Sequence, residues 1–580
     1  MKRIGYYLKN YKKESVLGPL FKMLEAFFDL LVPLVMAKMI DVGISNGDQP
    51  YIIKMSLLLI LLAIVGLSCS VTAQFFAAKA AVGFATGLRH DMFKHIQGLG
   101  YTELDKVGTS TLITRMTSDV NQVQNGVNMC LRLLLRSPFI VFGAMISAFT
   151  IDGDAALIFV VTIPVLAAIV YGIMFITMPM YKKVQASLDT VLGRTRENLT
   201  GVRVIRAFNK ESHEIEAFEE ENEALNVNQR LAGRISGLTN PMTYVVVNLA
   251  TAWLLYVSGI QIDAGDLTQG QLIAMVNYMT QILIELVKLA NLIVTLTKAM
   301  ACFDRIENVL EMQNEMEYVK EDEAAKDAGV SFQNVSLTYN MAGDASLQNI
   351  TFSAPKGSIV GVIGGTGSGK SSLVNLIPRF YDATKGEVLI DGVNVKNLTK
   401  DTLQEKIGVV PQKSLLFAGT IRDNLRWGNE NATDEELWEA LRISQGEEFV
   451  KSKPNQLDEM VEQGGKNFSG GQRQRLTIAR AMVKKPEILI LDDSASALDF
   501  ATDAALRKAI SSIENPPTMF IVSQRASSIQ FADQIIVLDD GECVGLGTHD
   551  KLLETCETYK EIYDSQFEKP EDMLAREAKA

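Results

Sequence analysis

The sequence predicts two parts of different fold class, a helical region that crosses a membrane six times and an α/β domain behind it. Three observations support this prediction. Long apolar runs dominate up to about residue 301, whereas charged and mixed patterns follow. An apolar strand pattern at 358–363 runs into the glycine-rich stretch GGTGSGKS, and a second one at 487–491 ends in two aspartates. With 580 residues, the chain is also too long for a single core.

Six apolar segments are long enough to cross a bilayer, which requires about 20 residues each. They are residues 16–42, 53–76, 129–151, 155–178, 239–262 and 271–296. The short connections 45–50, 151–154 and 259–270 contain no Lys or Arg, whereas the connections 79–115 and 181–234 are long, amphipathic and rich in both. Because basic loops stay on the cytoplasmic side, we expect a multi-pass protein of the cell membrane with both termini and both long loops in the cytoplasm.

Composition excludes several classes of partner and site. The net charge of −12 argues against nucleic acid, since no basic face of the needed size is present. The five cysteines show no CxxC or paired spacing, so neither a disulfide frame nor a zinc site is expected. The basic and aromatic N-terminus lacks the apolar core of a signal peptide. It predicts instead an amphipathic helix on the cytoplasmic membrane face.

Four ionisable residues lie inside the predicted spans. Glu25 and Asp29 are one helical turn apart on the first, and Glu285 and Lys288 are spaced i, i+3 on the sixth. A charge facing lipid costs at least ~2.5–3.5 kcal/mol, so each should face a cavity or a partner. Two interpretations stay open here: a polar element of a substrate path, or a structural ion pair.

The second part carries a complete GxxxxGK[ST] motif that opens a helix after a strand. Its residues, with the serine that follows, are Gly364, Gly365, Thr366, Gly367, Ser368, Gly369, Lys370, Ser371 and Ser372. Glycines at these positions let backbone N–H groups approach phosphate oxygens. Lys370 is expected to reach the terminal phosphates and the Ser371 hydroxyl to join a magnesium shell. Many nucleotide-binding proteins share this motif alone.

A second stretch of the sequence narrows the choice among nucleotide-binding proteins. Phe468 is followed by Ser469, Gly470, Gly471 and Gln472, a glycine-rich turn that opens a basic helix. Free N–H groups and the positive helix end favour an anion there. The strand 487–491 then ends in Asp492 and Asp493, where a magnesium carboxylate is expected. FSGGQ, ILILDD and SALD resemble the signature, Walker B motif and D-loop (496–499) of ATP-binding cassette (ABC) proteins.

This resemblance implies the fold class: an α-helical transmembrane domain of six spans, of the exporter type, followed by an α/β P-loop ABC nucleotide-binding domain. We expect the transmembrane domain with two long cytoplasmic coupling loops at 1–305, a linker at 306–329, the nucleotide-binding domain at 330–566 and a charged tail at 567–580. In this family the long loops dock on the nucleotide-binding domains. The stretches 108–119 and 201–208 resemble family patterns near those loops.

The resemblance also implies ATP and Mg²⁺ as the bound species. Tyr339 matches the aromatic residue that stacks on adenine, and Gln412 matches the Q-loop glutamine, which contacts magnesium and senses the docking loops. Ser371, Gln412 and Asp492 would form the metal set. In the family each ATP lies between the Walker motifs of one cassette and the signature of the other.

Two positions depart from the family pattern. Asp493 replaces the glutamate that polarises the attacking water, and its side chain is one methylene shorter, roughly 1.5 Å of reach. A general base must lie within about 2.6–3.2 Å of its proton. Gln524 replaces the switch histidine and cannot carry the imidazole's positive charge. With the weakened base Asp493, Gln524 and Gln412 as catalytic residues, the site should bind ATP well and hydrolyse it poorly.

A weakened site beside an intact signature resembles one half of a bacterial heterodimeric multidrug ABC exporter. The expected partners are a second half-transporter chain, the lipid bilayer and a hydrophobic or amphipathic small molecule that is exported. Two alternatives stay open: a homodimeric exporter or lipid flippase with slow ATPase activity, and a regulatory ABC membrane ATPase without transport. The predicted spans exclude soluble ABC proteins, and the fused domain order disfavours importers.

Overall fold

The structure is a computed structural model, which describes residues 2–323, 329–339, 343–494 and 498–567. The chain forms two units. The membrane unit comprises Met1–Gln97 and Ser110–Met312, and the α/β unit comprises Gly98–Thr109 and Gln313–Ala580. A short segment of the first long loop therefore belongs to the α/β unit. The expected tail beyond residue 567 lies outside the described residues.

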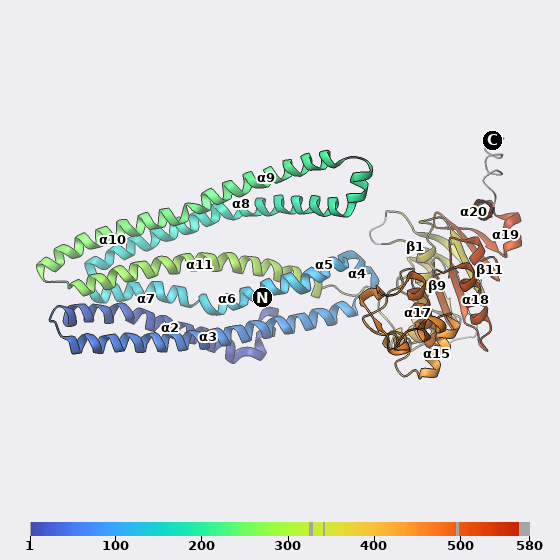
Figure 1. Cartoon of the computed structure of the whole chain (residues 1–580), viewed down its shortest axis with the longest axis horizontal. Coiled ribbons are helices and arrows are strands. Elements are labelled where there is room, and N and C mark those ends of the chain that lie inside the picture. Colours follow the sequence, from blue (N-terminus) through green and yellow to red (C-terminus); the bar gives the residue numbers. More distant parts are fainter. Residues whose placement is uncertain (1, 324–328, 340–342, 495–497, 568–580) are drawn as a thin grey trace. The chain divides into compact units, whose positions relative to one another are not determined.

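Long helices build the membrane unit (Figure 1). They are α1 Lys2–Leu8, α2 Lys12–Lys38, α3 Gln49–Gly98, α5 Thr109–Thr114, α6 Val120–Leu133, α7 Arg136–Ile151, α8 Gly153–Ala207, α9 Glu211–Gly237, α10 Thr239–Ala264 and α11 Gln269–Leu310. The π-helical turns η2 Met39–Ile44 and η3 Arg115–Asp119 extend α2 and join α5 to α6. Each predicted long loop is thus mostly helix that continues a span.

Five segments of the described chain are long and apolar enough to cross a membrane: Gln49–Gly98, Thr109–Ile151, Gly153–Ala207, Glu211–Ala264 and Gln269–Leu310. The first predicted span, in α2, is not among them, because its apolar stretch contains three charged residues, Lys22, Glu25 and Asp29. α2 nevertheless packs against α7 and α11, and the Tyr278 hydroxyl on α11 donates to the Leu30 carbonyl oxygen at 2.6 Å. α2 therefore packs within the helical bundle, where the first of the six predicted spans is expected.

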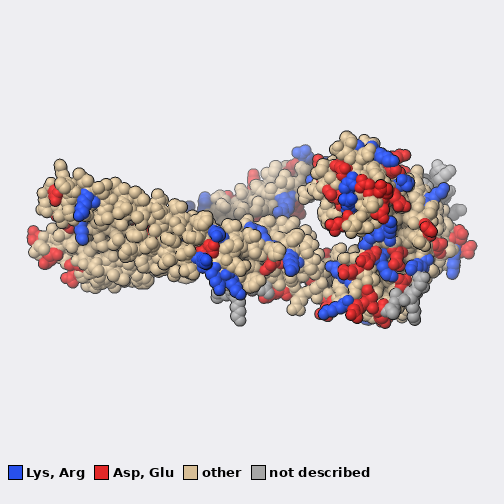
Figure 2. Space-filling view, turned by 90° about the horizontal axis from the view of Figure 1, so that it is seen from below, with Lys and Arg blue, Asp and Glu red and all other residues tan. Residues whose placement is uncertain are grey.

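The buried face of these helices is apolar. Much of their outward face is apolar as well, as expected for side chains that contact lipid. Ile140, Phe159, Leu254 and Met279 are at most 2% exposed and lie in one core cluster. On the face of the membrane-spanning helices seen in Figure 2, Lys, Arg, Asp and Glu are few. Trp253 and Leu249 on α10 remain more than half exposed.

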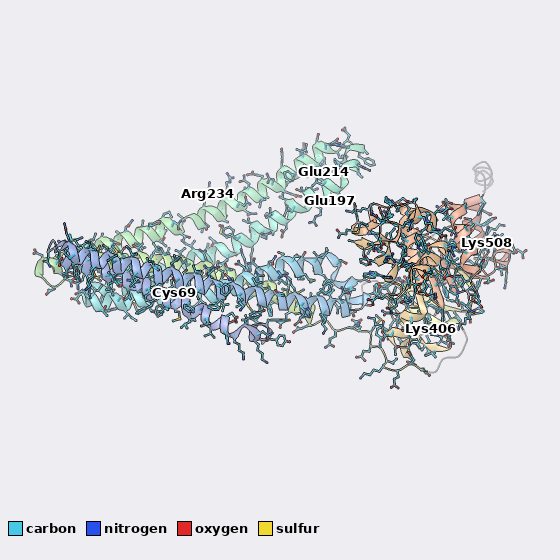
Figure 3. The ribbon with its side chains drawn as sticks, turned by 60° about the horizontal axis from the view of Figure 1, so that its bottom comes forward. Cys69, Glu197, Glu214, Arg234, Lys406 and Lys508 are labelled. Carbon is cyan, nitrogen blue, oxygen red and sulfur yellow. The ribbon has the colours of Figure 1, made fainter. Side chains whose placement is uncertain are left out.

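The second long loop is a helical hairpin of α8 and α9, which run side by side (Figure 1). Arg194 on α8 links the two helices through Glu221 at 2.7 Å and Glu214 at 3.5 Å. Figure 3 labels Glu214 on α9 and Glu197 on α8. The turn at the end of α8 exposes apolar side chains, with Phe208 72% exposed.

A ten-stranded sheet organises the described part of the α/β unit, in the order β5-β4-β1-β2-β12-β11-β3-β10-β9-β6. Its strands are β1 Val330–Leu337, β2 Leu347–Ala354, β3 Ile359–Gly364, β4 Lys385–Ile390, β5 Val393–Asn394, β6 Ile407–Val410, β9 Ile488–Asp492, β10 Thr518–Val522, β11 Gln534–Asp539 and β12 Glu542–Gly547. β7 Gly419–Thr420 and β8 Met460–Val461 pair separately. The neighbours β11, β3, β10, β9 and β6 are parallel, and β3, β9 and β10 are almost entirely buried, as in sheets covered on both faces.

Helices surround this sheet. They are α12 Lys370–Leu376, α13 Lys400–Lys406, α14 Ile421–Arg426, α15 Asp434–Ile443, α16 Glu447–Lys451, α17 Gly470–Val483, α18 Phe500–Ser511, α19 His549–Thr555 and α20 Glu557–Phe567. One core cluster includes Leu476 of α17, Leu489 of β9 and Tyr559 of α20. A second includes Phe332 of β1, Leu373 of α12 and Phe520 of β10. The two clusters fix the central strands relative to the helices that flank them.

The short helix α4, Tyr101–Val107, comes from the first long loop and belongs to the α/β unit. The ring of Tyr101 packs on Phe380 with centroids 4.5 Å apart. The Tyr381 hydroxyl donates to Asp105 Oδ2 at 2.6 Å. Burial, followed by this hydrogen bond, raises the pKa of the Tyr381 phenol. Lys106 on α4 also pairs with Glu315 at 2.6 Å. Aromatic contacts, a charge-assisted hydrogen bond and this ion pair therefore hold α4 in the α/β unit.

Candidate active site

The candidate site lies where four neighbouring parallel strands end. β3 leads into the P-loop, β9 ends at Asp492, β10 is followed by Gln524 and β6 by Gln412. Because parallel strands end at the same edge of a sheet, these groups come together although they are far apart in the sequence. This edge is where ligands bind in open α/β sheets.

One cavity of about 260 Å³ gathers most of the predicted residues. It is lined by Ser346, Thr366, Gly367, Gly369, Lys370, Ser371, Ser372, Gln412, Asp492, Asp493, Val522, Ser523 and Gln524. The P-loop, both aspartates, the Q-loop glutamine and the glutamine in the switch position therefore share one cavity. Gly364, Gly365 and Ser368 support the loop from outside this lining.

The P-loop backbone depends on glycine. Gly369 has a φ of +93°, and a Cβ there would lie 2.6 Å from the Ser346 carbonyl oxygen. Gly367 has a φ of +86°, yet a Cβ at this position would meet open space. The Gly367 backbone thus borders open space in the cavity. The chemistry suits a phosphate chain, since N–H groups and a helix N-terminus attract anions.

The Lys370 ammonium lies within this loop. Its Nζ donates to the carbonyl oxygens of Gly364 at 2.9 Å and Gly365 at 2.5 Å. Burial lowers the pKa of Lys370, while Asp493 and Asp492 oppose that shift. Phosphate oxygens would offer this ammonium stronger acceptors than the two carbonyl groups.

Asp492 and Ser371 meet at the base of the cavity. The Ser371 hydroxyl donates to Asp492 Oδ1 at 3.1 Å. Burial raises the pKa of Asp492, and Ser371 partly offsets this effect. A carboxylate beside a hydroxyl is an oxygen donor set that suits Mg²⁺, which usually keeps several waters and takes few protein ligands. The residues present fit that ion.

Asp493 and Gln412 face one another in the cavity. Gln412 Nε2 donates to Asp493 Oδ2 at 3.4 Å. Asp493 adopts a left-handed backbone conformation with a φ of +46°, and its N–H donates to the Val522 carbonyl oxygen at 3.0 Å. The backbone of Asp493 is therefore fixed to β10. A hydrogen bond thus joins the ends of the two strands, β9 and β6, that carry Asp493 and Gln412.

Gln524 follows β10 on an exposed turn. Its carbonyl oxygen accepts from Gln566 Nε2 at 2.8 Å, and Gln566 Oε1 accepts from the Ala526 N–H at 2.9 Å. Gln566 on α20 therefore fixes the backbone on both sides of Arg525. Sequence reasoning missed this role, because nothing in the sequence links residues 524 and 566.

Tyr339 lines a neighbouring cavity of about 390 Å³ rather than the first one. Its hydroxyl donates to Ser372 Oγ at 3.0 Å, and Ser372 lines the first cavity. The Tyr339 ring meets Tyr381 edge to face, with centroids 5.0 Å apart. The predicted adenine-stacking residue is thus linked both to the P-loop helix and, through Tyr381, to α4.

The signature residues do not line the cavity. Ser469 is the N-cap of α17 and forms a capping box with Gln472, in which Ser469 Oγ accepts from the Gln472 N–H at 3.3 Å and Gln472 Oε1 accepts from the Ser469 N–H at 3.0 Å. Gly470 and Gly471 form the first turn, and Ser469 and Gly470 are exposed. Because this capped helix end is exposed and does not line the cavity, it is available to another molecule. Residues 496 and 497 of the predicted D-loop lie outside the described residues.

Comparison with known proteins identifies the family. Residues 15–286 match the family model described as the ABC transporter transmembrane region, and residues 347–496 match the one described as ABC transporter. A Mycobacterium tuberculosis (strain CDC 1551 / Oshkosh) protein named as an uncharacterised ABC transporter ATP-binding protein is 35% identical over 97% of this chain and 97% of its own length.

The chain belongs to the ABC transporter family.

Two Bacillus subtilis (strain 168) proteins also match this ABC transporter. YfiB, an uncharacterised ABC transporter ATP-binding protein, is 35% identical over 98% of this chain and 99% of its own length. YgaD, named as a candidate multidrug export ATP-binding/permease protein, is 31% identical with the same coverage. Among solved structures, a bacterial Atm1-family ABC exporter with ATP bound has a TM-score of 0.77 at 22% identity, covering 97% of this chain and 99% of its own.

The fold prediction is therefore confirmed: a helical transmembrane domain of the exporter type precedes an ABC nucleotide-binding domain. Membership of the family makes the protein an ATP-hydrolysing transporter that binds ATP in its ABC domain.

Proposed function

We propose that this ABC transporter is one half of a heterodimeric exporter that moves hydrophobic or amphipathic small molecules across the cell membrane. The observation that carries the proposal is the composition of the cavity, in which an intact P-loop faces Asp493 and Gln524. On the same chain the signature is intact and capped, and its Ser469 and Gly470 are exposed. The basic long loops support a cytoplasmic position for both termini and the ABC domain.

In this site the chain's own groups bind and orient ATP. The glycine N–H groups and Lys370 hold the phosphates, and the Tyr339 ring stacks on adenine. Ser371, Asp492 and Gln412 would hold Mg²⁺, which neutralises charge on the β- and γ-phosphates when it is bound. These roles rest on the fit of the donor atoms and on the family pattern.

Catalysis at this site is weak for two reasons. Asp493 is short by one methylene, its backbone is fixed to β10 by the hydrogen bond to Val522, and its carboxylate is shared with Gln412. It therefore cannot move easily toward a water that a glutamate would reach. Gln524 can donate a neutral hydrogen bond to a γ-phosphate, but it offers no positive charge to the transition state.

The partner chain explains why the signature is intact. Ser469 and its neighbours would close over ATP held by the partner's Walker motifs, where a glutamate and a histidine carry out hydrolysis. The partner's own signature, which faces Asp493, is expected to be imperfect. ATP at the Asp493 site then persists across cycles and acts as a regulatory clamp.

The transport direction and substrate class rest on similarity and on the membrane unit. The relative YgaD is named for multidrug export, and the fold matches an exporter. The hairpin of α8 and α9 ends in the exposed Phe208, which suits docking on the partner's ABC domain. Closure of two ABC domains around ATP would then open the bundle outward.

The test is ATPase activity of the purified chain, alone and co-expressed with a second half-transporter. We expect activity only in the mixture, lost when the partner's catalytic glutamate is replaced and merely altered by Asp493→Asn. Robust activity of the chain alone that disappears in Asp493→Asn would contradict the proposal, because Asp493 would then be a working base in a homodimer. A vesicle uptake assay with a fluorescent hydrophobic dye separates a pump from a regulatory ATPase.

A further inference from the structure

Six charged side chains meet in the middle of the membrane unit, between α2, α7 and α11. Arg136 lies at their centre. Its Nη1 donates to Glu285 Oε1 at 2.6 Å, its Nη2 donates to Asp29 Oδ2 at 3.1 Å, and Nη2 lies 3.8 Å from Glu25 Oε1. Lys22 pairs with Glu25 at 2.6 Å, and Lys288 pairs with Glu285 at 2.8 Å.

The network is electrically balanced. Three cations, Lys22, Arg136 and Lys288, face three carboxylates. Asp29 lies at the midpoint of the predicted first span, 16–42, so the network lies at the depth of the bilayer core. A ligand with a net charge would disturb this balance, whereas one with a positive and a negative group would keep it.

The members of the network differ in exposure. Glu285 is 3% exposed, and its second oxygen accepts from the Ser137 hydroxyl at 2.7 Å, so it is saturated. The side chains of Asp29 and Lys288, by contrast, are each 44% exposed. Among the described residues each has one hydrogen-bond partner. Charges that face lipid at this depth are strongly unfavourable, so these two require a polar environment.

A cavity of about 250 Å³ provides this polar environment. Asp29, Lys288, Arg136 and Gln281 line this cavity. Within the described chain, Arg136 Nε and Gln281 Oε1 are buried without a hydrogen-bond partner, and Arg136 as a whole is 8% exposed. The cavity thus contains one unused donor and one unused acceptor besides the two half-exposed charges, which is the pattern of a site built for a polar ligand.

We propose that this cavity binds a zwitterionic head group, with its ammonium group on Asp29 and its anionic group on Lys288. Ile140 and Ile284 form part of the apolar wall. Arg136 Nε and Gln281 Oε1 supply the remaining polar contacts. The exported molecule is then an amphiphile of zwitterionic character, rather than a simple cation or anion.

The size of the cavity limits what it holds. Pockets that enclose drug-sized ligands measure ~300–1,000 Å³, so about 250 Å³ suits a head group better than a whole amphiphile. Ile284 is 47% exposed at its edge, which leaves an apolar path for an attached chain. A head group on an acyl chain and the same head group free in water share this chemistry, and the experiment separates them.

This inference rests on the proposed export function for its meaning, but its test measures binding without ATP. The full chain is placed in nanodiscs of phosphatidylglycerol, so that the bilayer supplies no zwitterionic head group. Binding of radiolabelled lysophosphatidylcholine is measured against empty nanodiscs. Glycerophosphocholine serves as the free head group, and lysophosphatidylglycerol and an alkyltrimethylammonium of matched chain length serve as singly charged probes.

Charge variants assign the contacts. Asp29→Asn should weaken the binding of lysophosphatidylcholine and of alkyltrimethylammonium at least tenfold. Lys288→Gln should weaken the binding of lysophosphatidylcholine and of lysophosphatidylglycerol by the same factor. Asp154→Asn and Lys182→Gln, which remove exposed charges of α8, are the matched controls. Ile284→Phe narrows the cavity without changing charge, and it should also weaken lysophosphatidylcholine. Gel filtration verifies that each variant is folded.

Equal binding of the zwitterionic and singly charged probes would overturn the inference, as would unchanged binding in Asp29→Asn and Lys288→Gln. Binding of glycerophosphocholine as tight as that of lysophosphatidylcholine would keep the site but assign it to a free zwitterion. The experiments distinguish failure of this inference from failure of the export proposal. Dye uptake that persists without zwitterion binding would rule out only the zwitterion site. Specific zwitterion binding without ATP-driven dye uptake would rule out only the export function.

Discussion

In the proposed function, the difference between an aspartate and a glutamate at residue 493 limits ATP hydrolysis at this site. The cavity already contains the groups that bind phosphate, and Lys370 and Asp492 are positioned by short contacts. According to the proposal, the site lacks side-chain reach at Asp493 and positive charge at Gln524. Both deficits concern the transition state more than the bound substrate, so binding and turnover should separate.

In the two-chain mixture whose partner has lost its catalytic glutamate, Asp493→Glu is therefore expected to raise ATP turnover at least tenfold, because the added methylene brings the carboxylate within reach of water. Combining it with Gln524→His should raise turnover further, while ATP affinity changes little. Steady-state ATPase assays and binding of a fluorescent ATP analogue measure the two effects. No increase in either variant would show that geometry other than side-chain reach limits the site.

Asp492 carries a cost in stability that the function requires. Burial raises its pKa, so the ionised form is disfavoured in the folded chain. Asp492→Asn should accordingly raise the melting temperature of the nucleotide-free protein at neutral pH. The gain should shrink as the pH falls through the raised pKa toward the ordinary value of 3.8, since the wild-type carboxyl is then protonated.

Thermal unfolding at several pH values tests this prediction, with Asp499→Asn as a control of opposite sign. Backbone and side-chain hydrogen bonds from Thr502 lower the pKa of Asp499. Its charge is therefore favourable at neutral pH, and the control variant should lower the melting temperature. A lower melting temperature for Asp492→Asn at neutral pH would contradict the account.

Pairs close in sequence were predictable, and pairs between helices were not. The i, i+3 spacing of Glu285 and Lys288 left an ion pair as one of two open interpretations, and the structure shows this pair at 2.8 Å. Arg136 was missed, although it is the cation that joins Asp29 to Glu285. It lies 107 residues from Asp29 and 149 from Glu285, and only the packing of three helices brings these groups together.

At the scale of the element, α17 shows how one helix end serves both fold and function. Its capping box satisfies backbone groups that a helix start leaves free. α15 has the same device, with Thr433 and Glu436 in place of Ser469 and Gln472. The two caps are alike in geometry, yet only the one on α17 carries the signature.

Ser469→Ala and Thr433→Ala should each cost about 1 kcal/mol of stability, as cap removal usually does. Only Ser469→Ala should also reduce ATPase activity of the two-chain mixture strongly, because its hydroxyl would face the partner's ATP. Chemical denaturation and steady-state ATPase assays measure the two effects. Equal loss of activity in both variants would indicate that α17 acts through stability alone.

The hydrogen bond between Tyr381 and Asp105 should couple α4 to the nucleotide site, since Tyr381 also packs on Tyr339. Tyr381→Phe keeps the rings and removes the hydrogen bond. We expect basal ATPase activity to persist while dye uptake per ATP hydrolysed falls by half or more. Tyr563→Phe on α20, also an aromatic contact, is the control. Unchanged coupling in Tyr381→Phe would exclude this route.

Sequence patterns predicted the elements of the site because its motifs are local. The P-loop and the Walker B strand each occupy fewer than ten consecutive residues, and parallel strands must end at one edge. The docking of α4 on Phe380 and Tyr381 was only an expectation of the family, with no residues assigned. A seven-residue helix inside a long loop gives no sign of which distant aromatic residues it will meet.

At the scale of the whole molecule, the sequence predicts the orientation of the chain in the membrane but cannot supply its partner. Loop charges and span lengths follow from this chain alone. The proposed heterodimer does not, because the residues that would complete each ATP site belong to another sequence. The substitutions at residues 493 and 524 motivate the proposal of a partner chain without describing that chain.

Thiol labelling tests the orientation. All five native cysteines are unpaired and none is fully exposed, so the background with a membrane-impermeant maleimide should be low. In right-side-out vesicles Asn46→Cys should react and Lys210→Cys should not, and inverted vesicles should reverse the result. Labelling of Lys210→Cys from outside would place the α8–α9 hairpin on the wrong side.

The α/β unit is built from two separate stretches of the chain, and this has a consequence for biosynthesis. Asp105 precedes the tyrosine that binds it by 276 residues. At roughly 5–20 residues per second, the ribosome needs about 15–55 s to make the second half of this contact. During that interval α4 has left the ribosome, but Phe380 and Tyr381, which contact it, have not yet been made. The chain therefore completes its α/β unit late. A product truncated before these residues would lack their contacts with α4.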